Sequence, residues 1–450
     1  MTSTRSTQGM ADGLAGRLEA EGFEHLWVAY TDYHGRLAGR DVPRVRFGAV
    51  AERGTNFARA NFNYTIRDEQ VAEPRFGADT GDVLAIPDPA SVVPLPFRPA
   101  TAFGFAVLHD EDGGVWEGCP RGALLRAVRT LAEAGLSARV AFEPEFYLLA
   151  DAGGTPANTT GMYTIDGLDR EAAFVEQVVA TLPAMGVTLE AIGKEYGRGQ
   201  YEANVAPDDP VSAADDLFLL RLAIRHLARD QGLLATFMPK LDASVAGSGL
   251  HVHLSLQDAA TGEDRTAGED PSGLSARARG FMAGWLAHAE ALTGLGAPTP
   301  NSYKRLQPAS WAPAHICWGI GNRAALVRIP GPGKRARLEF RCGDNTASPY
   351  LFLAGLLWAG LDGMRRGLEP GNPAPGDVGH LDPASLAQRG IRLLPREPGV
   401  ALDALAADDV LAEGLGPVVH PEFLRVKQAE LAAYRMQVSA WERASYLEAP

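Results

Sequence analysis

The sequence predicts a protein of the mixed α+β class, in which a small β-rich N-terminal unit, residues 1–118, precedes a larger unit, residues 119–450. Three observations support this prediction. Two short apolar segments near the N-terminus flank a turn, the segment 82–99 is rich in proline, and apolar residues recur with helical spacing soon after Cys119. Beyond that point, strand patterns alternate with helical patterns to the C-terminus.

The N-terminal unit is expected to contain a β-hairpin within residues 24–46. Residues 26–30 are apolar and aromatic, His34 and Gly35 suit a turn, and residues 37–42 form a returning strand. The prolines of the segment 82–99 argue against a helix, because proline lacks the backbone N–H that a helix interior needs. An extended, loop-rich passage is therefore expected before the second unit.

The larger unit is expected to begin with a helix over residues 121–134, which Gly135 ends. Its later helices are expected at residues 170–184, 213–231, 273–293, 349–366 and 422–446.

The composition excludes several classes of function. A formal net charge of −13 gives no general attraction to nucleic acid or to an anionic membrane. The three cysteines, Cys119, Cys317 and Cys342, have no paired spacing, so neither a disulfide framework nor a structural zinc site is predicted. Neither a leader-like start nor an apolar run of membrane-spanning length occurs, so we expect a cytoplasmic protein.

Four short segments each place ionisable groups on one side of a predicted strand and apolar groups on the other. The segments are residues 138–149, 199–205, 249–256 and 336–341. Their polar faces carry Glu143 and Glu145; Gln200, Glu202 and Asn204; His251, His253 and Ser255; and Arg337, Glu339 and Arg341. Glu195 lies just before the second segment.

Such alternation has two interpretations. For any single strand, an ordinary solvated sheet face is the more frequent explanation. Four strands with carboxylates, a histidine pair and arginines instead favour one shared site, provided that the strands are neighbours. Oxygen and imidazole ligands without cysteine suit Mg²⁺ or Mn²⁺, and arginines beside them suit a phosphorylated substrate. These groups match the requirements of phosphoryl transfer.

The nucleotide site cannot be a P-loop, because the sequence has no GxxxxGK[ST] motif. The short run Gly247-Ser248-Gly249 has two interpretations that we weigh equally. It is either a tight turn into the following strand or a place where the backbone approaches a substrate.

Six motifs in the larger unit resemble those of the glutamine synthetase family, and they occur in the family's order. They are Glu-Pro-Glu-Phe at 143–146, Gly-Gln-Tyr-Glu at 199–202, Gly-Ser-Gly-Leu-His-Val-His at 247–253, Asn-Ser-Tyr-Lys-Arg at 301–305, the arginines after residue 322, and Arg-Leu-Glu-Phe-Arg at 337–341. The resemblance covers nearly the whole chain, because residues 31–43 also resemble the family's N-terminal domain. It implies an N-terminal β-grasp domain and a catalytic domain with a curved antiparallel sheet flanked by helices.

The resemblance implies a role for each matching residue. The implied metal ligands are Glu145, Glu195 and Glu202 on the glutamate side, and Glu143, His251 and Glu339 on the phosphate side. The implied substrate-binding residues are Arg305, Gly247, Arg341 and Tyr163, and the implied nucleotide-binding residues are His253, Ser255, Arg328, Lys334 and Arg337. The implied catalytic residues are Arg323, Glu339, Arg341 and Trp311.

The implied reaction uses ATP and two or more Mg²⁺ or Mn²⁺ ions. Glutamate attacks ATP to give γ-glutamyl phosphate, and an amine then displaces phosphate. The family builds each active site between the catalytic domain of one subunit and the β-grasp domain of its neighbour, so a dodecamer of two hexameric rings is expected.

Two departures from the family pattern concern the amine. Ammonia-using members carry an aspartate in a region that here reads Phe-Ala-Arg-Ala-Asn-Phe-Asn-Tyr at 57–64, without an acidic residue. They also carry a glutamate where this chain has Trp311, a large ring that can cover an alkyl chain or face a cation. The chain therefore resembles the γ-glutamylamine synthetase branch, whose acceptors include polyamines such as putrescine and monoamines such as ethanolamine.

Three alternatives remain open at this stage. The chain could be a true glutamine synthetase that uses ammonia, although the acidic residues expected at the two altered positions are absent. It could be a non-catalytic structural member of the fold, although all six metal-ligand positions are filled. A metallohydrolase would leave the arginines and the nucleotide-matching residues without a role.

Overall fold

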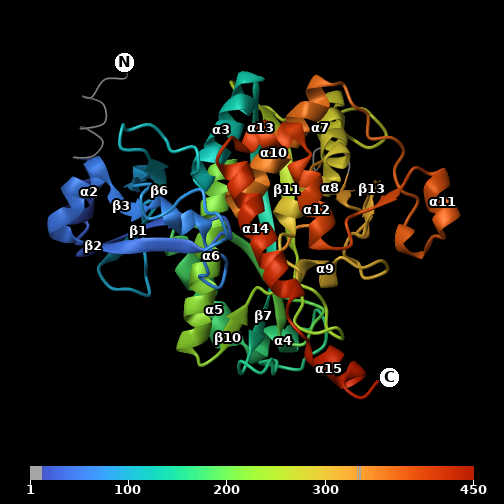
Figure 1. The fold of residues 1–450 in the computed structure, drawn as a ribbon, viewed down its shortest axis with the longest axis horizontal. Coiled ribbons are helices and arrows are strands. Elements are labelled where there is room, and N and C mark those ends of the chain that lie inside the picture. Colours follow the sequence, from blue (N-terminus) through green and yellow to red (C-terminus); the bar gives the residue numbers. More distant parts are fainter. Residues whose placement is uncertain (1–12, 332, 334–335, 450) are drawn as a thin grey trace.

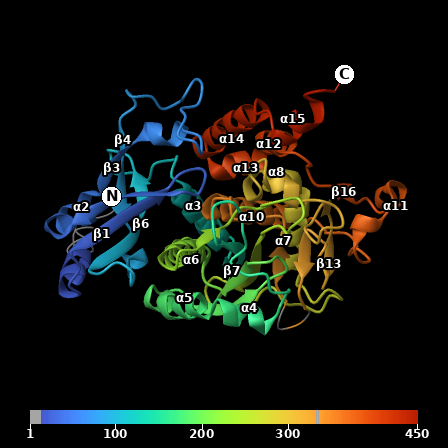
Figure 2. The ribbon, with the colours of Figure 1, turned by 90° about the horizontal axis from the view of Figure 1, so that it is seen from below.

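The computed structural model of the chain describes residues 13–331, 333 and 336–449. Two sheets and a layer of helices confirm the predicted mixture of helix and strand (Figure 1). Figures 1 and 2 both place the first sheet on one side of the molecule and β13 and α11 on the other. None of the described helices is both long enough and apolar enough to span a membrane.

The predicted N-terminal hairpin is confirmed. β1 (His25–Thr31) pairs antiparallel with β2 (Leu37–Pro43). Gly35 occupies the turn at φ 71°, where a Cβ atom would also lie 2.9 Å from the Cα of Ser348, so two constraints favour glycine there. The sheet has the order β2-β1-β6-β4-β3, in which β3 is Thr55–Ala58, β4 is Asp82–Pro87 and β6 is Thr101–His109. β5 (Val93–Pro94) also pairs with β6.

The larger sheet contains all four predicted strands, and they are neighbours. Its order is β13-β14-β15-β11-β7-β9-β8, with β10 added beside β7. The bounds are β7 Leu136–Leu149, β8 Leu189–Lys194, β9 Gln200–Val205, β10 Leu234–Thr236, β11 Leu250–Asp258, β13 Trp318–Ile320, β14 Val327–Ile329 and β15 Leu338–Phe340. All pairings are antiparallel except the parallel pair β13 and β14. A separate pair joins β12 (His315–Ile316) to β16 (Arg392–Leu393).

The register of these strands brings the ionisable residues onto one face. Glu143 lies directly opposite His251, and Glu145 lies directly opposite Glu202. His253 in turn lies opposite Glu339. Because directly opposed residues project to the same side of a sheet, the four polar strand faces form one continuous surface.

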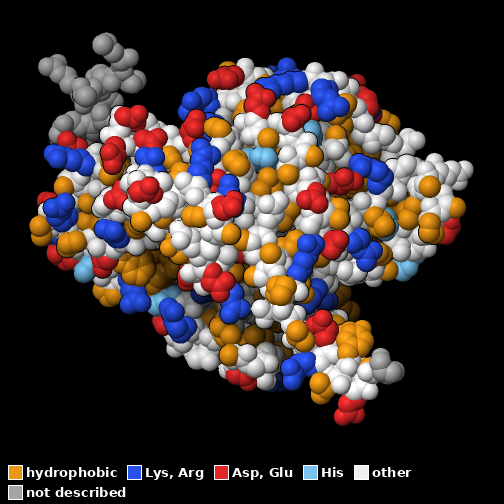
Figure 3. Space-filling view, viewed as in Figure 1, with side chains coloured by type: hydrophobic (Ala, Val, Ile, Leu, Met, Phe, Trp, Pro, Cys, Tyr) orange, Lys and Arg blue, Asp and Glu red, His pale blue; other side chains and the backbone are white. Residues whose placement is uncertain are grey.

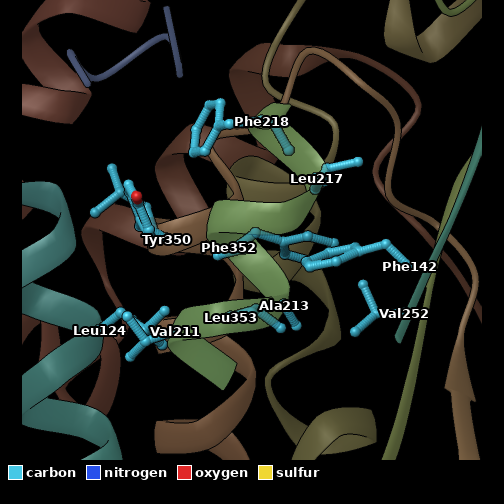
Figure 4. Close-up of a cluster of buried hydrophobic side chains, with 14 of the residues drawn as sticks. Leu124, Phe142, Val211, Ala213, Leu217, Phe218, Val252, Tyr350, Phe352 and Leu353 are labelled. Carbon is cyan, nitrogen blue, oxygen red and sulfur yellow. The ribbon is translucent and has the colours of Figure 1, made fainter. Parts of the chain in front are cut away.

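The opposite face of this sheet is covered by helices. Phe142 of β7 and Val252 of β11 point towards Leu217 of α6 (Pro210–Asp230) and Phe352 of α10 (Pro349–Arg365), as Figure 4 shows. These side chains are at most 1% exposed, and they belong to one apolar cluster that continues into the N-terminal sheet. The core therefore fixes which way each strand faces.

The remaining helices surround this core. They are α2 Phe47–Arg53, α3 Pro120–Glu133, α4 Ile165–Arg170, α5 Ala172–Ala184, α7 Ala276–Ala287, α8 Ala289–Gly296, α9 Ser302–Arg305, α11 Pro383–Gln388, α12 Pro398–Ala406, α13 Asp409–Leu415, α14 Val419–Arg435 and α15 Ala440–Tyr446. The helices expected at 121–134, 213–231 and 349–366 match α3, α6 and α10 within a few residues. On the surface, acidic and basic side chains are interspersed over the face in Figure 3.

Three expected helices are each divided in two. The expectation for 170–184 covers the end of α4 and the whole of α5, separated at Glu171. The expectation for 273–293 is divided at His288, whose ring nitrogens lie 2.6 Å from Asp408 and 3.0 Å from Asp362. The expectation for 422–446 ends at Arg435, and Ser439 begins α15 with a capping box to Glu442.

Helices α7 and α10 cross at small residues. A Cβ atom on Gly284 would collide with the carbonyl oxygen of Ala359, and one on Gly363 would collide with the backbone of Gly280 and Gly284. The close crossing therefore depends on the absence of side chains at these positions.

We expect Gly284→Ala to lower the free energy of unfolding by about 1–3 kcal/mol, because the added methyl group must separate two packed helices. Urea titration followed by circular dichroism measures the change. Gly48→Ala in α2 is the matched control, since a Cβ atom there has no neighbour within 4 Å. An equal effect of both substitutions would contradict the packing argument.

Candidate active site

A cleft of about 740 Å³ opens on the polar face of the larger sheet. Most of the site residues predicted from the sequence line it. They are Glu143, Glu145, Tyr163, Glu195, Glu202, Gly247, His251, Arg305, Trp311, Arg323, Arg328, Arg337 and Arg341. The structure therefore brings together residues that are far apart in the sequence.

Three carboxylates, those of Glu145, Glu195 and Glu202, crowd one side of the cleft. Burial and the charges of Glu143, Glu145 and Glu195 raise the pKa of Glu202 to about 9. Burial and the charge of Glu145 raise the pKa of Glu195 to about 7. Glu145 itself accepts hydrogen bonds from the backbone N–H of Gly249 at 2.9 Å and from Gln200 at 3.3 Å. This concentration of negative charge is of the kind that a bound cation relieves.

Two imidazoles flank Glu143. His253 Nε2 lies 2.9 Å from one oxygen of Glu143, and His251 Nδ1 lies 3.5 Å from the other. Burial alone would raise the pKa of Glu143, but the two histidines reverse this effect and hold the pKa well below its usual value. His253 Nδ1 accepts a hydrogen bond from Arg337 Nε at 3.0 Å, which leaves the proton of a neutral ring on Nε2, towards Glu143.

Glu339 lies beneath the cleft and is fully buried. Arg328 donates to it at 2.8 Å, and Arg341 donates to its other oxygen. Burial opposes ionisation, but the positive charge of Arg341 and of the neighbouring groups lowers the pKa of Glu339 below its usual value. Glu339 therefore stays anionic and orients two arginines at the cleft.

Arg305 explains the glycines of the run 247–249. A Cβ atom on Gly247 would lie 2.7 Å from Arg305 Cγ, and one on Gly249 would lie 2.7 Å from Arg305 Nη2. Neither glycine has a positive φ, so the requirement here is space and not a left-handed turn. Arg305 is 5% exposed. Its guanidinium donates to the carbonyl oxygens of Cys342 and Arg341 at 3.0 and 3.1 Å.

Three aromatic rings line one side of the opening. Tyr196 contacts Tyr163 edge-on at 5.2 Å between ring centroids, and it contacts Trp311 edge-on at 5.3 Å. The Tyr163 hydroxyl donates to Glu195 at 3.2 Å. All three side chains are exposed, Trp311 at 57%. We call these three residues the aromatic rim.

Two residues of the aromatic rim have a strained backbone. Tyr163 has φ 56° and Trp311 has φ 64°, in the left-handed region that non-glycine residues rarely adopt. Non-glycine residues in this conformation are concentrated at functional sites, where the surrounding structure holds them.

The predicted nucleotide residues His253 and Ser255 line a second cavity, of about 250 Å³. It shares Glu143, Asn204 and Arg337 with the cleft, so the two spaces are neighbours on the polar face of the sheet. Lys334, also predicted to bind nucleotide, lies outside the described residues.

Some site residues were not predicted. Tyr196 and Lys240 line the cleft, and only the position of Tyr196 beside Glu195 gave a signal in the sequence. Conversely, residues 57–64 lie away from the cleft of the same chain. There Asn63 is buried and donates to Glu422 of α14 at 2.7 Å.

The donors at the cleft fit divalent metal ions. Glu143, Glu202 and His251 present ligand atoms within 4.8 Å of one another, as do Glu143, His253 and Glu339. His251 Nδ1 is a buried nitrogen without a hydrogen-bond partner among the described residues. Oxygen and imidazole donors of this kind suit a hard or borderline divalent ion.

The family model and known proteins that match most of the chain point to one family. The model of the glutamine synthetase catalytic domain matches residues 117–446. A glutamine synthetase of Thermococcus kodakarensis is 34% identical over 91% of this chain and 89% of its own length. A glutamate–methylamine ligase of Methyloversatilis universalis is 33% identical over 94% of this chain and 96% of its own length.

Solved structures agree with these relatives. A GmaS–ADP complex superimposes with a TM-score of 0.88 at 33% identity, covering 97% of this chain and 99% of its own. Both the family model and relatives that match along most of the chain thus agree with the arrangement of carboxylates, histidines and arginines on the sheet. The chain belongs to the glutamine synthetase family and is an ATP-dependent glutamate ligase.

Proposed function

We propose that this ligase joins the γ-carboxyl group of glutamate to an organic amine through γ-glutamyl phosphate, and that ammonia is a poor acceptor. The observation that carries the proposal is the aromatic rim beside the carboxylate cluster. Trp311 stands where ammonia-using relatives are expected to carry a glutamate, and its ring contacts Tyr196 instead of presenting a charge. The Trp311 ring can cover an alkyl group and attract an alkylammonium ion, whereas it offers ammonium no carboxylate.

We further propose that the carboxylates and histidines of the cleft hold Mg²⁺ or Mn²⁺. Glu145, Glu195 and Glu202, which all line the cleft, would form the site nearer glutamate. Glu143, His251 and Glu339 would form the site nearer the phosphates, and His251 Nδ1 lies 3.5 Å from Glu143 and 3.9 Å from Glu339. When bound, these ions neutralise phosphate oxygens and make the γ-phosphoryl group a better electrophile. The protein's part would be to fix the ligands, and the register of β7, β9, β11 and β15 supports this role for the ligands that lie on these strands.

The arginines suit the remaining charges of the reaction. Arg305, Arg341, Arg323 and Arg328 all line the cleft. Arg305 and Arg341 would hold the carboxylates of glutamate, and Arg323 and Arg328 would face the transferred phosphate. His253, Ser255 and Arg337 in the adjoining cavity suit the nucleotide. Preorganised cations of this kind stabilise a transition state without reorganising during the reaction.

The acceptor amine is proposed to enter past the aromatic rim. The relative from Methyloversatilis universalis is a glutamate–methylamine ligase, which favours a small alkylamine. Ethanolamine and polyamines such as putrescine are the other acceptors that this wall suits. True glutamine synthesis is the second candidate, because the relative from Thermococcus kodakarensis is a glutamine synthetase at similar identity.

We also propose that the active site is completed by a second copy of the chain, in the dodecamer of two hexameric rings that the family resemblance implies. Residues 1–118 would act as the β-grasp domain and residues 119–450 as the catalytic domain. None of the described residues of the first unit lines the cleft of its own chain. In addition, Met436, Trp441 and Leu447 are 81%, 67% and 74% exposed in the projecting C-terminal segment (Figure 1), which suits contact with another subunit.

Metal binding is the first prediction. We expect Mg²⁺ or Mn²⁺ at about 100-fold excess over Kd to stabilise the protein by about 2.7 kcal/mol, measured as a rise in the thermal midpoint. Glu202→Gln removes one ligand charge and is expected to abolish most of this gain, while Glu133→Gln, exposed at the end of α3, keeps it. If the metal raised the thermal midpoint equally in the wild type, Glu202→Gln and Glu133→Gln, the ions would bind away from Glu202.

The stability of the metal-free protein should depend on pH. Burial and neighbouring carboxylates raise the pKa of Glu202 from 4.5 to about 9, so between these values the folded state binds more protons than the unfolded state. Stability is therefore expected to fall as pH rises from about 5 to about 9. Thermal midpoints across this range, with a chelator present, measure the slope. The slope should be smaller in Glu202→Gln. If this variant has the same slope as the wild type, the pH dependence comes from other groups.

Acceptor choice is tested by phosphate release from ATP with glutamate and ammonia, methylamine, ethanolamine or putrescine. We expect at least one of the amines to give a kcat/KM about tenfold or more above that of ammonia. A ratio of this size corresponds to one cation–π or apolar contact of ~1–2 kcal/mol in the transition state. Turnover with ammonia that matches every amine would refute the proposal.

The role of Trp311 has its own test. Trp311→Glu is expected to raise kcat/KM for ammonia and lower it for the preferred amine, because a carboxylate replaces the aromatic wall. Trp311→Phe, which keeps a ring at the same strained backbone position, should retain the amine preference. If Trp311→Glu leaves the ratio of amine to ammonia turnover unchanged, the ring does not select the acceptor.

A further inference from the structure

A separate cavity of about 510 Å³ lies where the β1–β2 hairpin, α6 and α14 meet. It shares no lining residue with the active-site cleft. Its charged lining is mostly cationic: Arg36, Arg221, Arg225 and Lys427 face the single carboxylate of Glu430, and His34 also lines the cavity. In a protein with a net charge of −13, such a lining needs a local explanation.

Three of the five basic groups already have acidic partners. Arg36 donates to Asp32 at 2.7 Å and to Asp68 at 3.0 Å. Lys427 donates to Glu430 at 3.0 Å, and His34 Nε2 lies 2.7 Å from the same carboxylate. The Glu430 carboxylate, which lines the cavity, is therefore already engaged by Lys427 and His34.

The two arginines of α6 that line the cavity have no such partner. Arg221 and Arg225 lie four residues apart, on the same side of the helix, so their charges repel each other. Among the described residues, no carboxylate lies within 4.0 Å of either guanidinium. Asp344 attracts Arg221 without forming an ion pair within 4.0 Å. Its Oδ1 accepts hydrogen bonds from the backbone and hydroxyl of Thr346, and its Oδ2 is buried without a hydrogen-bond partner among the described residues.

Arg221 also carries an unused donor inside the protein. The residue is 6% exposed, and its Nε donates to Asn345 Oδ1 at 3.2 Å. Its Nη2 is buried and has no hydrogen-bond partner among the described residues. Burial lowers the pKa of Arg221 to about 9, a measure of how poorly this charge is compensated. A buried unpaired guanidinium nitrogen costs free energy unless something accepts from it.

Arg225 provides a second arm at the open side of the cavity. It is exposed, and its guanidinium lies over the Phe237 ring at 5.2 Å from the centroid, a contact that limits where the side chain can point. An acceptor between Arg221 and Arg225 would satisfy the unused nitrogen and relieve the repulsion between the two charges. Planar guanidinium groups recognise phosphate and carboxylate oxygens in this way.

We propose that this cavity is a binding site for a compact oxyanion, a phosphate group or a small carboxylate, held by Arg221 and Arg225 with Lys427 and Arg36 beside them. The site is distinct from the catalytic cleft and does not depend on which amine the ligase uses. The volume admits a small ligand but is well below that of the cleft.

One residue joins the two sites. Asn345 accepts from Arg221 in the cavity, and its amide donates to the carbonyl oxygens of Glu145 and Gly249 at 3.0 Å each. A substitution at Arg221 can therefore disturb the active site without any bound anion. Direct binding, and not catalytic rate, is for this reason the measurement that tests the proposal.

The experiment uses the assembled, Mg²⁺-loaded protein and isothermal titration calorimetry with inorganic phosphate and, separately, with succinate. The wild type is compared with Arg225→Ala and Arg221→Gln. Arg229→Ala, an exposed arginine of α6 that does not line the cavity, is the matched control. Arg323→Ala serves as the control for phosphate binding in the catalytic cleft.

We expect at least one of the two probes to bind the wild type, and its affinity to fall about tenfold or more in Arg225→Ala and Arg221→Gln while Arg229→Ala and Arg323→Ala retain it. The probe that binds more tightly distinguishes a phosphate site from a carboxylate site. Absence of binding by both probes overturns the proposal, as does binding that only Arg323→Ala weakens. If Arg221→Gln fails to fold, Arg225→Ala decides alone, since Arg225 is exposed and can be removed without opening the core.

Discussion

The active site depends first on the antiparallel register of β15, β11, β7 and β9. This register sets Glu143 opposite His251 and Glu145 opposite Glu202, so that residues from four strands act on the same space. The helices behind the sheet enforce it, because a slip by one residue would turn Phe142 into the cleft and Glu143 into the apolar core. Hydrophobic burial of one face thereby positions the charges of the other.

The same arrangement makes the site electrostatically unfavourable in the metal-free chain. The raised pKa values of Glu195 and Glu202 express the repulsion among carboxylates that the fold holds close together, and Arg328 and Arg341 offset it only around Glu339. Packing elsewhere must supply the free energy that holds like charges together. A cation bound among these carboxylates would relieve part of this repulsion, and metal affinity would then be coupled to stability.

The sequence allowed the strands and their polar faces to be predicted, because a period of two in β7 and β11 is unambiguous when one face is buried. Helix ends were less predictable. His288, at the break between α7 and α8, contacts Asp408 and Asp362, which are distant in sequence, and no local pattern predicts such partners. The polar strand faces indicated the carboxylates and histidines of the site, and the family motifs implied their roles. Tyr196 had only its position beside Glu195 as a signal, and the pair Arg221 and Arg225 is recognised only when the packing is known.

Backbone strain gives a last argument about the aromatic rim. Left-handed conformations at Tyr163 and Trp311 cost about 1–2 kcal/mol each for residues with a Cβ atom, and glycine would avoid that cost. The chain nevertheless carries large rings at both positions. Edge-on contacts with Tyr196 and the hydrogen bond from Tyr163 to Glu195 offset only part of the strain. Because backbone conformation alone would favour glycine at both positions, the rings are best explained by what they contact at the mouth of the cleft.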